Sequence, residues 1–183
     1  MTDAADPLED LPGDLMIWVL IVSELAVFGA GLLAFLVVRL LDPTGFAEAQ
    51  DQLHRVGAGV NTVVLITSGW LAAHASAAVM AGRLTAARWT LAGAASLGLV
   101  FLAVKSTEFA SLAAIGISTD THPLFTFYYL LTGFHAAHVL AGVVILGIIA
   151  WRPTPDVAEN GVAFWHMVDL AWVILFPVLY LVR

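Results

Sequence analysis

Long apolar stretches separated by short polar segments dominate the pattern of this 183-residue chain. Five of them reach about 20 residues or more, which is the length that a helix needs to cross roughly 30 Å of hydrocarbon. They cover residues 15–40, 57–80, 89–110, 124–151 and 161–182. Membrane β-strands would instead appear as short alternating segments. The pattern therefore predicts an all-α integral membrane protein, a bundle of five transmembrane helices.

The polar segments between the spans are too short to hold a soluble domain. We expect one transmembrane domain over residues 15–183, preceded by an acidic tail over residues 1–14 that has no basic residue. The first span is not expected to be a cleaved signal peptide, because it lacks a basic leading segment and its apolar run is too long. Basic residues divide evenly between the two expected faces, so charge leaves the orientation open.

Composition narrows the classes of function. The chain is 61% hydrophobic and only 11% charged, and its formal net charge is −7. It contains no cysteine, which excludes disulfides and thiolate metal sites. No basic patch suited to nucleic acid occurs. Function is therefore expected inside the membrane.

Prolines and small residues refine the expected helices. Residues 42–45 (Asp-Pro-Thr-Gly) predict a turn between the first two spans, and Pro177 predicts a kink in the last span or the end of its regular part. Small residues recur at every fourth position of the second span, which permits close approach of helices. These stripes are Ser68/Ala72/Ser76 and Gly69/Ala73/Ala77. We expect packing within the bundle, with docking of another subunit as the alternative.

Ionisable residues lie inside the expected spans, where they are energetically costly and are therefore functional candidates. These are Glu24, Lys105, Glu108, His135, His138, His166 and Asp169. Three pairs have members three residues apart, so the members of each pair share one helix face. They are Lys105/Glu108, His135/His138 and His166/Asp169. Besides a functional role, each pair has a structural interpretation: Lys105/Glu108 as a neutralising pair near an interface, the two histidines as core residues hydrogen-bonded to a carbonyl or hydroxyl of a neighbouring helix, and His166/Asp169 as a structural pair. Up-and-down topology places Lys105 and Glu108 in one half of the membrane and Glu24, His166 and Asp169 in the other.

Glu24 is the least easily explained of these residues. It lies roughly 14 Å into the first span, at about 1.5 Å per residue. The positions three and four residues away, Leu20, Ile21, Val27 and Phe28, offer no basic partner. Glu24 must therefore find a partner on another helix, be protonated, or face water or a lipid headgroup. A role in proton uptake and a purely structural hydrogen bond both remain open.

Three classes of function fit these residues. A metal or haem enzyme would use His135, His138 and His166 as ligands, but no extended ligand motif accompanies them. A proton-coupled transporter, or a stand-alone membrane protein, would use a buried relay of histidines and carboxylates; the paired repeats of many transporters are not found. A non-catalytic membrane subunit would use the polar residues to hold lipid, helices or a partner. The small-residue stripes and short loops favour this third class.

Five segments carry a more specific signal. They lie at 13–25 (including Ser-Glu-Leu), 60–68 (including Val-Asn-Thr), 105–109 (Lys-Ser-Thr-Glu-Phe), 132–139 (Thr-Gly-Phe-His-Ala-Ala-His-Val) and 165–172 (Trp-His-Met-Val-Asp-Leu-Ala-Trp). In this order they resemble the subunit III family of the haem-copper oxidases. Its five-span forms occur as bacterial cytochrome c or ubiquinol oxidase subunits. The chain looks most like a third form, the E-type accessory protein of nitric oxide reductase.

The resemblance implies a subunit that binds no haem, copper or other metal and has no active site of its own. It implies that catalytic subunit I is the partner, with subunit II as a further candidate. The complex would be a terminal oxidase or a nitric oxide reductase in the bacterial cytoplasmic membrane. The N-terminus would be cytoplasmic and the C-terminus periplasmic.

The resemblance also implies roles for individual residues. Family members hold phospholipid and support assembly, proton uptake and turnover of the catalytic subunit, and Glu24 matches their membrane carboxylate on the proton-uptake side. The family's lipid cleft has one arm made of two N-terminal helices that this short form lacks. The residues expected to be buried polar or lipid-site residues are Lys105, Glu108, His135, His138, Arg152, His166 and Asp169.

Overall fold

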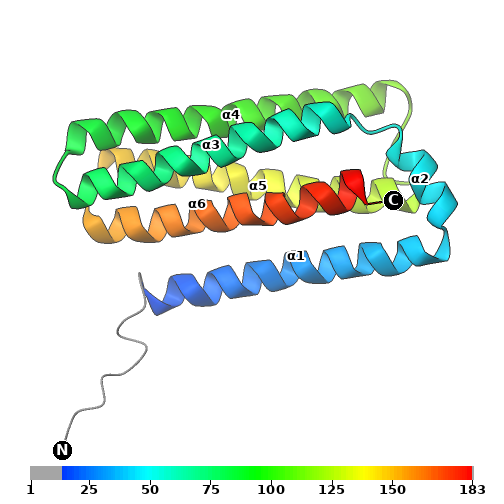
Figure 1. Ribbon diagram of the computed structural model, residues 1–183, viewed down its shortest axis with the longest axis horizontal. Helices are drawn as coiled ribbons and strands as arrows, with labels where there is room; N and C mark the ends of the chain where they lie inside the picture. The colour runs from blue at the N-terminus through cyan, green and yellow to red at the C-terminus, as the bar shows by residue number, and fades with distance from the viewer. Residues whose placement is uncertain (1–13, 183) are drawn as a thin grey trace, which may run out of the picture.

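The structure, a computed structural model, describes residues 14–182, so the predicted acidic tail lies outside the described residues except for Asp14. The helices are α1 (Leu15–Leu41), α2 (Pro43–Gln50), α3 (Arg55–Met80), α4 (Leu84–Ala114), α5 (Pro123–Trp151) and α6 (Pro155–Phe176), followed by the π-helical turn η1 (Pro177–Leu181). Figure 1 shows the long helices side by side with short connections. Five helices of the described region are long and apolar enough to cross a membrane, with α6 and η1 together as the last. The predicted all-helical chain with five apolar spans is confirmed.

Two helices begin earlier than their apolar stretches. α4 begins at Leu84 and α6 at Pro155, whereas the sequence predicted spans from residues 89 and 161. The added turns contain polar residues such as Arg88 and Asn160. Apolar length marks the part of a helix that lies in hydrocarbon, and helical hydrogen bonding continues beyond it.

The turn predicted at residues 42–45 is wrong, because this segment begins the short helix α2. Asp42 caps the helix: its Oδ1 accepts a hydrogen bond of 3.0 Å from the backbone N–H of Gly45. Pro43 suits the first helical position, where no N–H is needed. The hydrogen bond from Gly45 and the nearby His122 imidazole lower the pKa of the Asp42 carboxyl. His122 Nε2 lies 3.6 Å from Asp42 Oδ2, which ties α2 to the start of α5.

The prediction for Pro177 is confirmed, since regular α-helix ends at Phe176 and the chain continues as η1. Two buried side chains form hydrogen bonds with the backbone in and just after η1. The Arg39 guanidinium of α1 donates to the carbonyl of Val182. Gln50 of α2 donates to the carbonyl of Leu179 at 2.8 Å. Two backbone carbonyls at the end of the chain thus receive donors from α1 and α2.

Helices α3 to α6 form a closely packed core in which small residues set the spacing. Ser68 of α3 donates to the carbonyl of Ala94 on α4 at 2.7 Å, and Ala94 is fully buried. A Cβ at Gly98 would lie 2.8 Å from Trp165 Cη2, closer than van der Waals contact allows. The expected use of the first small-residue stripe within the bundle is confirmed at Ser68.

Helix α1 packs less deeply than the other spans and lies along one side of the core in Figure 1. Of its most apolar window 17% is buried, against 56% for the last span. Its buried residues form one stripe: Phe28, Leu32, Phe35 and Arg39. α1 therefore rests on α5 and α6 as an outer helix.

Candidate functional site

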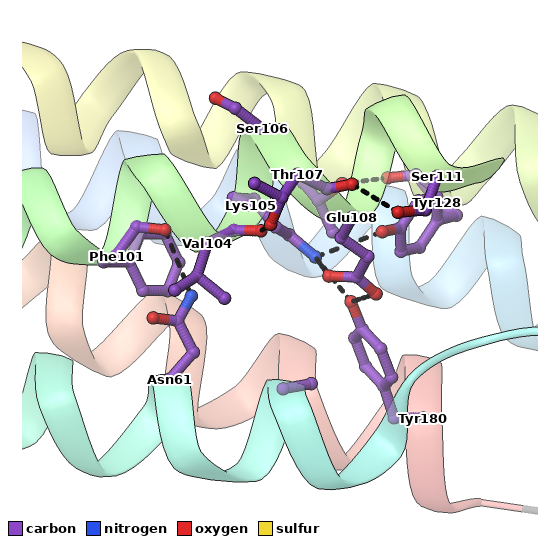
Figure 2. A network of polar contacts seen from close by, with 12 residues as sticks. Asn61, Phe101, Val104, Lys105, Ser106, Thr107, Glu108, Ser111, Tyr128 and Tyr180 are labelled. Atoms are coloured by element: carbon purple, nitrogen blue, oxygen red, sulfur yellow. Dashed lines mark hydrogen bonds and ion pairs between the residues drawn. The ribbon is translucent and has the colours of Figure 1, made fainter. Parts of the chain in front are cut away.

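A cluster of four polar side chains lies where α4, α5 and η1 meet (Figure 2). Lys105 Nζ of α4 donates to Glu108 Oε2 at 2.9 Å, to Tyr128 Oη of α5 at 3.2 Å and to Tyr180 Oη of η1 at 2.5 Å. Tyr180 in turn donates to Glu108 Oε1 at 2.9 Å. An ammonium has three protons to donate, and here each has an acceptor. We call these four residues the Lys105 cluster.

Aromatic rings surround the buried ammonium. Lys105 Nζ lies between 4.8 and 5.6 Å from the ring centroids of Phe109, Tyr128, Trp172 and Tyr180. Ring faces at this range attract a cation, more strongly where water is excluded. Lys105 is 2% exposed. The interpretation of Lys105 and Glu108 as a neutralising pair is confirmed, but the tyrosines were missed because they lie on other elements.

A cavity of about 250 Å³ borders the cluster on one side. Its lining includes Glu108, Thr107 and Ser111 of α4 and His54 at the start of α3. Glu108 itself is 8% exposed, so little of its side chain reaches this cavity. The ammonium remains behind it, enclosed by the aromatic rings.

The second contact joins α1 to α5. Glu24 Oε2 lies 3.2 Å from His138 Nε2, an ion-pair distance, although the alignment does not meet hydrogen-bond geometry. His138 Nδ1 lies 2.9 Å from the carbonyl of Phe134, and since a carbonyl only accepts, Nδ1 carries a proton. The Glu24 side chain is 27% exposed and that of His138 15%. Glu24 therefore has its partner on another helix, which was one of the open possibilities.

Two phenylalanines, one on α1 and one on α5, hold the His138 imidazole beside Glu24. Phe28 and Phe134 pack against the imidazole, with ring centroids 5.6 and 4.5 Å away.

His135 does not act with His138, although they lie three residues apart. It is fully buried, stacks on Trp172 at 5.1 Å and meets the edge of Phe101 at 5.5 Å. Neither ring nitrogen has a hydrogen-bond partner among the described residues, so the expected carbonyl or hydroxyl partner is not found. Within residues 14–182, no group of three or more histidines and carboxylates could hold a metal ion.

The third contact, between His166 and Asp169, lies on α6 where it crosses α3. His166 Nδ1 is 3.7 Å from Asp169 Oδ2, and the His166 side chain is 46% exposed. Gly69 of α3 makes room for this carboxylate, because a Cβ there would overlap it. Arg152 lies outside all three contacts: it ends α5, with its guanidinium 4.9 Å from the Trp151 ring centroid.

An apolar groove of about 440 Å³ separates the start of α1 from α5 and α6. Ile17 and Leu20 of α1 form one wall, and Ile148 and Phe164 belong to the other. Polar residues adjoin its end near the N-terminal face, where the backbone N–H of Asp14 donates to Asn160 at 3.1 Å. The groove thus has apolar walls and polar residues at its end near the N-terminal face.

The fold and these sites define a class: a membrane protein with five long apolar helices and ionisable side chains inside the spans, of which Glu24 and His138 lie on different helices. Comparison with known proteins then places it in a family. The family model described as cytochrome c oxidase subunit III matches residues 15–182. The chain belongs to the cytochrome c oxidase subunit III family, as its motifs suggested.

Individual relatives agree with this membership. Cytochrome c oxidase subunit 3 of a Synechocystis species is 28% identical over 170 residues, which cover 88% of this chain and 72% of the relative. The subunit 3 of Corynebacterium diphtheriae is 28% identical, over 90% of this chain and 86% of the relative. Heme-copper oxidase subunit I+III of Aeropyrum pernix is 31% identical, over 90% of this chain and 22% of the relative. The likeness to the nitric oxide reductase accessory protein stays a prediction.

Proposed function

We propose that this chain is a non-catalytic, subunit III-type membrane subunit of a respiratory haem-copper oxidoreductase. The observation that carries the proposal is the family match, which extends through all five spans. The chain would assemble with a catalytic subunit I, with subunit II as a further partner. The Aeropyrum relative, named as subunit I+III, joins the two subunits in one chain, which supports a direct contact between them.

Within this function we propose that the Glu24–His138 pair exchanges protons near the uptake side of the catalytic subunit. The two side chains lie 3.2 Å apart and both are partly exposed, which supports an exchange role. A structural role would hold α1 against α5 by the same contact. Glu24→Gln separates the two roles, because glutamine keeps the shape but does not titrate.

We further infer that phospholipid lies in the groove between α1 and the core, with an acyl chain along its apolar wall. The proposed orientation has the N-terminus in the cytoplasm and the C-terminus in the periplasm of a bacterial cell. Residues 15–183 would form one transmembrane domain. The family likeness supports each of these points.

Purification from native membranes in mild detergent tests the proposed function. We expect a tagged chain to retain a haem-containing catalytic subunit, identified by mass spectrometry and by its Soret absorption. The separated chain should show no Soret band and no stoichiometric metal. Recovery of the chain only as a monomer or homo-oligomer would contradict the proposal and would favour a stand-alone protein or proton-coupled transporter.

A further inference from the structure

The cavity of about 250 Å³ beside Glu108 is not used by the proposed function. It lies between the start of α3 and the last turns of α4, and its lining includes His54, Thr107, Glu108 and Ser111. Figure 2 shows Thr107, Glu108 and Ser111 on neighbouring turns of α4. Polar side chains from two elements thus meet at one cavity.

The cavity lies at the boundary of the membrane and not at its centre. Glu108 is two residues before the end of the apolar stretch 89–110, a depth of about 3 Å at 1.5 Å per residue. Lys105 is five residues before the same end, at about 8 Å. His54 precedes the apolar stretch 57–80 and is exposed. Water on this side of the bundle, which we call the α2 face, can therefore reach the cavity without crossing the hydrocarbon.

The two hydroxyl groups at the cavity have oxygen atoms free to accept hydrogen bonds. Ser111 Oγ donates its proton to the carbonyl of Thr107 at 2.8 Å, and Thr107 Oγ1 donates to the carbonyl of Val104 at 2.7 Å. A hydroxyl has one proton but two lone pairs, so each oxygen can still accept. A molecule that fills this cavity should therefore be a hydrogen-bond donor, which a phosphate or another anion is not.

The Glu108 carboxylate also has acceptor sites that the protein does not fill. Lys105 Nζ donates to its Oε2 and Tyr180 Oη to its Oε1, both at 2.9 Å. An ionised carboxylate offers about four lone-pair sites. The Glu108 side chain is 8% exposed, against 2% for Lys105. A donor in the cavity can therefore complete the hydrogen bonding of Glu108.

Water fits this cavity in size and in chemistry. One water takes up about 30 Å³ in the liquid and needs two to four polar partners, so several waters fit in about 250 Å³. Each can donate two hydrogen bonds to the carboxylate and the hydroxyl oxygens. An acyl chain in the same place would leave these acceptors without donors, which costs free energy.

We propose that the cavity is a water site filled from the α2 face, and that its water donates hydrogen bonds to Glu108, Thr107 and Ser111. The Lys105 cluster then has two different sides: aromatic rings exclude water from Lys105, and water completes the hydrogen bonding of Glu108. The inference goes beyond the proposed function and does not depend on it, because it uses only this chain's own side chains. It gives the α2 face a carboxylate in contact with water.

The reactivity of introduced thiols tests the proposal, since the chain has no cysteine of its own. Ser111→Cys and Thr107→Cys place one thiol at the cavity. Ser106→Cys, the control, places it at a similar level of α4 but outside the cavity lining, and all three positions are exposed. A cationic, membrane-impermeant methanethiosulfonate reagent reacts with the thiolate, which forms in water and not in hydrocarbon.

The reagent is applied in turn to right-side-out and inverted vesicles of native membranes, so that it meets the α2 face in one of the two. In that orientation we expect the two cavity thiols to react at least about tenfold faster than the control. Equal rates at the three positions overturn the inference. So does a lack of reaction at the cavity in both orientations, if the same thiols react after denaturation, because lipid or protein then fills the cavity.

Filling the cavity gives a second measurement. A Cβ at Gly57, which also lines the cavity, would lie 3.8 Å from His54 Cβ, an ordinary contact, so Gly57→Leu adds bulk there without a clash at the Cβ. Gly147→Leu on α5 is the control, because a Cβ there would meet nothing within 4 Å among residues 14–182. In the Ser111→Cys chain we expect Gly57→Leu to slow the modification about fivefold, since leucine displaces water. Gly147→Leu should leave the rate unchanged, and both variants should keep the parent Tm. Equal rates with the two leucine variants contradict the proposal.

Discussion

The Lys105 cluster and the Glu24–His138 pair both place ionisable groups inside the bundle, yet they are built differently. Lys105 has three oxygen acceptors and four surrounding rings, and it is 2% exposed. Glu24 has one contact, to His138, and is 27% exposed at its side chain. The first is a closed contact among α4, α5 and η1. The second is an open contact between an outer helix and the core.

This difference in burial and number of partners suits Lys105 to a structural role and Glu24 to the proposed proton-exchange role. A charge whose hydrogen bonds are all made inside a low-dielectric site gains stability only while every partner stays in place. A contact with a single partner at the edge of the bundle can be altered without disrupting the fold. Removal of a partner should therefore cost stability at Lys105 and turnover at Glu24.

The largest effect is expected at Lys105. Lys105→Met leaves Glu108 buried without its cation, and breaking a buried pair from one side costs about 3–5 kcal/mol. The double variant Lys105→Met/Glu108→Leu leaves no unpaired charge, so it should recover a large part of that loss. Unfolding of the detergent-solubilised protein, followed by circular dichroism, measures both. Equal losses in the single and double variants would show that the charge pair is not the stabilising contact.

A smaller loss is expected when one tyrosine loses its hydroxyl. Tyr180→Phe keeps the ring beside Lys105 but removes one acceptor for the ammonium and one donor to Glu108. We expect a loss of about 1–3 kcal/mol in the free energy of unfolding, the cost of an unsatisfied buried group. Tyr129→Phe is the control, because within residues 14–182 the Tyr129 hydroxyl donates to the carbonyl of Ile117 at 3.1 Å and to no member of the Lys105 cluster. A larger loss for the control would contradict this account of the cluster.

At the open contact, stability and turnover should separate. Glu24→Gln should change the free energy of unfolding less than Lys105→Met does, because Glu24 has one partly exposed contact and glutamine keeps its shape. If Glu24 exchanges protons, this variant should assemble normally but slow sustained turnover of the complex. Glu24→Leu should also weaken assembly, because His138 loses its partner. Equal turnover of the glutamine variant and wild type across about pH 6–9 would leave only the structural role.

From the sequence we could predict the contacts between residues of one helix, but not those between helices. The spans could be recognised because hydrocarbon demands long apolar runs. The pairing of Lys105 with Glu108 followed from helical spacing. The partnership of Glu24 with His138, and of Tyr180 with Lys105, depends on how each helix is rotated against its neighbours. A single sequence contains no periodic signal for that rotation.

The structure differs from the sequence predictions at two further places, residues 42–45 and His135. Asp-Pro-Thr-Gly at residues 42–45 is as suitable for a helix start as for a turn, since aspartate caps helices and proline fits their first turn. The sequence alone does not choose between them. His135 was expected to be hydrogen-bonded, but the rings of Phe101 and Trp172 enclose it instead. Aromatic residues on two other helices produce that environment.

The smallest effect is expected at Asp42. Its polar contacts lie outside the spans and serve as a reference for the Lys105 cluster and the Glu24–His138 pair inside them. The hydrogen bond from the Gly45 N–H and the nearby His122 lower the pKa of Asp42 in the folded protein. A lowered pKa stabilises the fold above the unfolded value of about 4, and the stabilisation is lost as pH falls through the folded value. Asp42→Asn keeps a capping oxygen but removes this dependence. The difference in Tm between wild type and variant should therefore shrink below about pH 4, and a difference that grows on acidification would contradict the assignment.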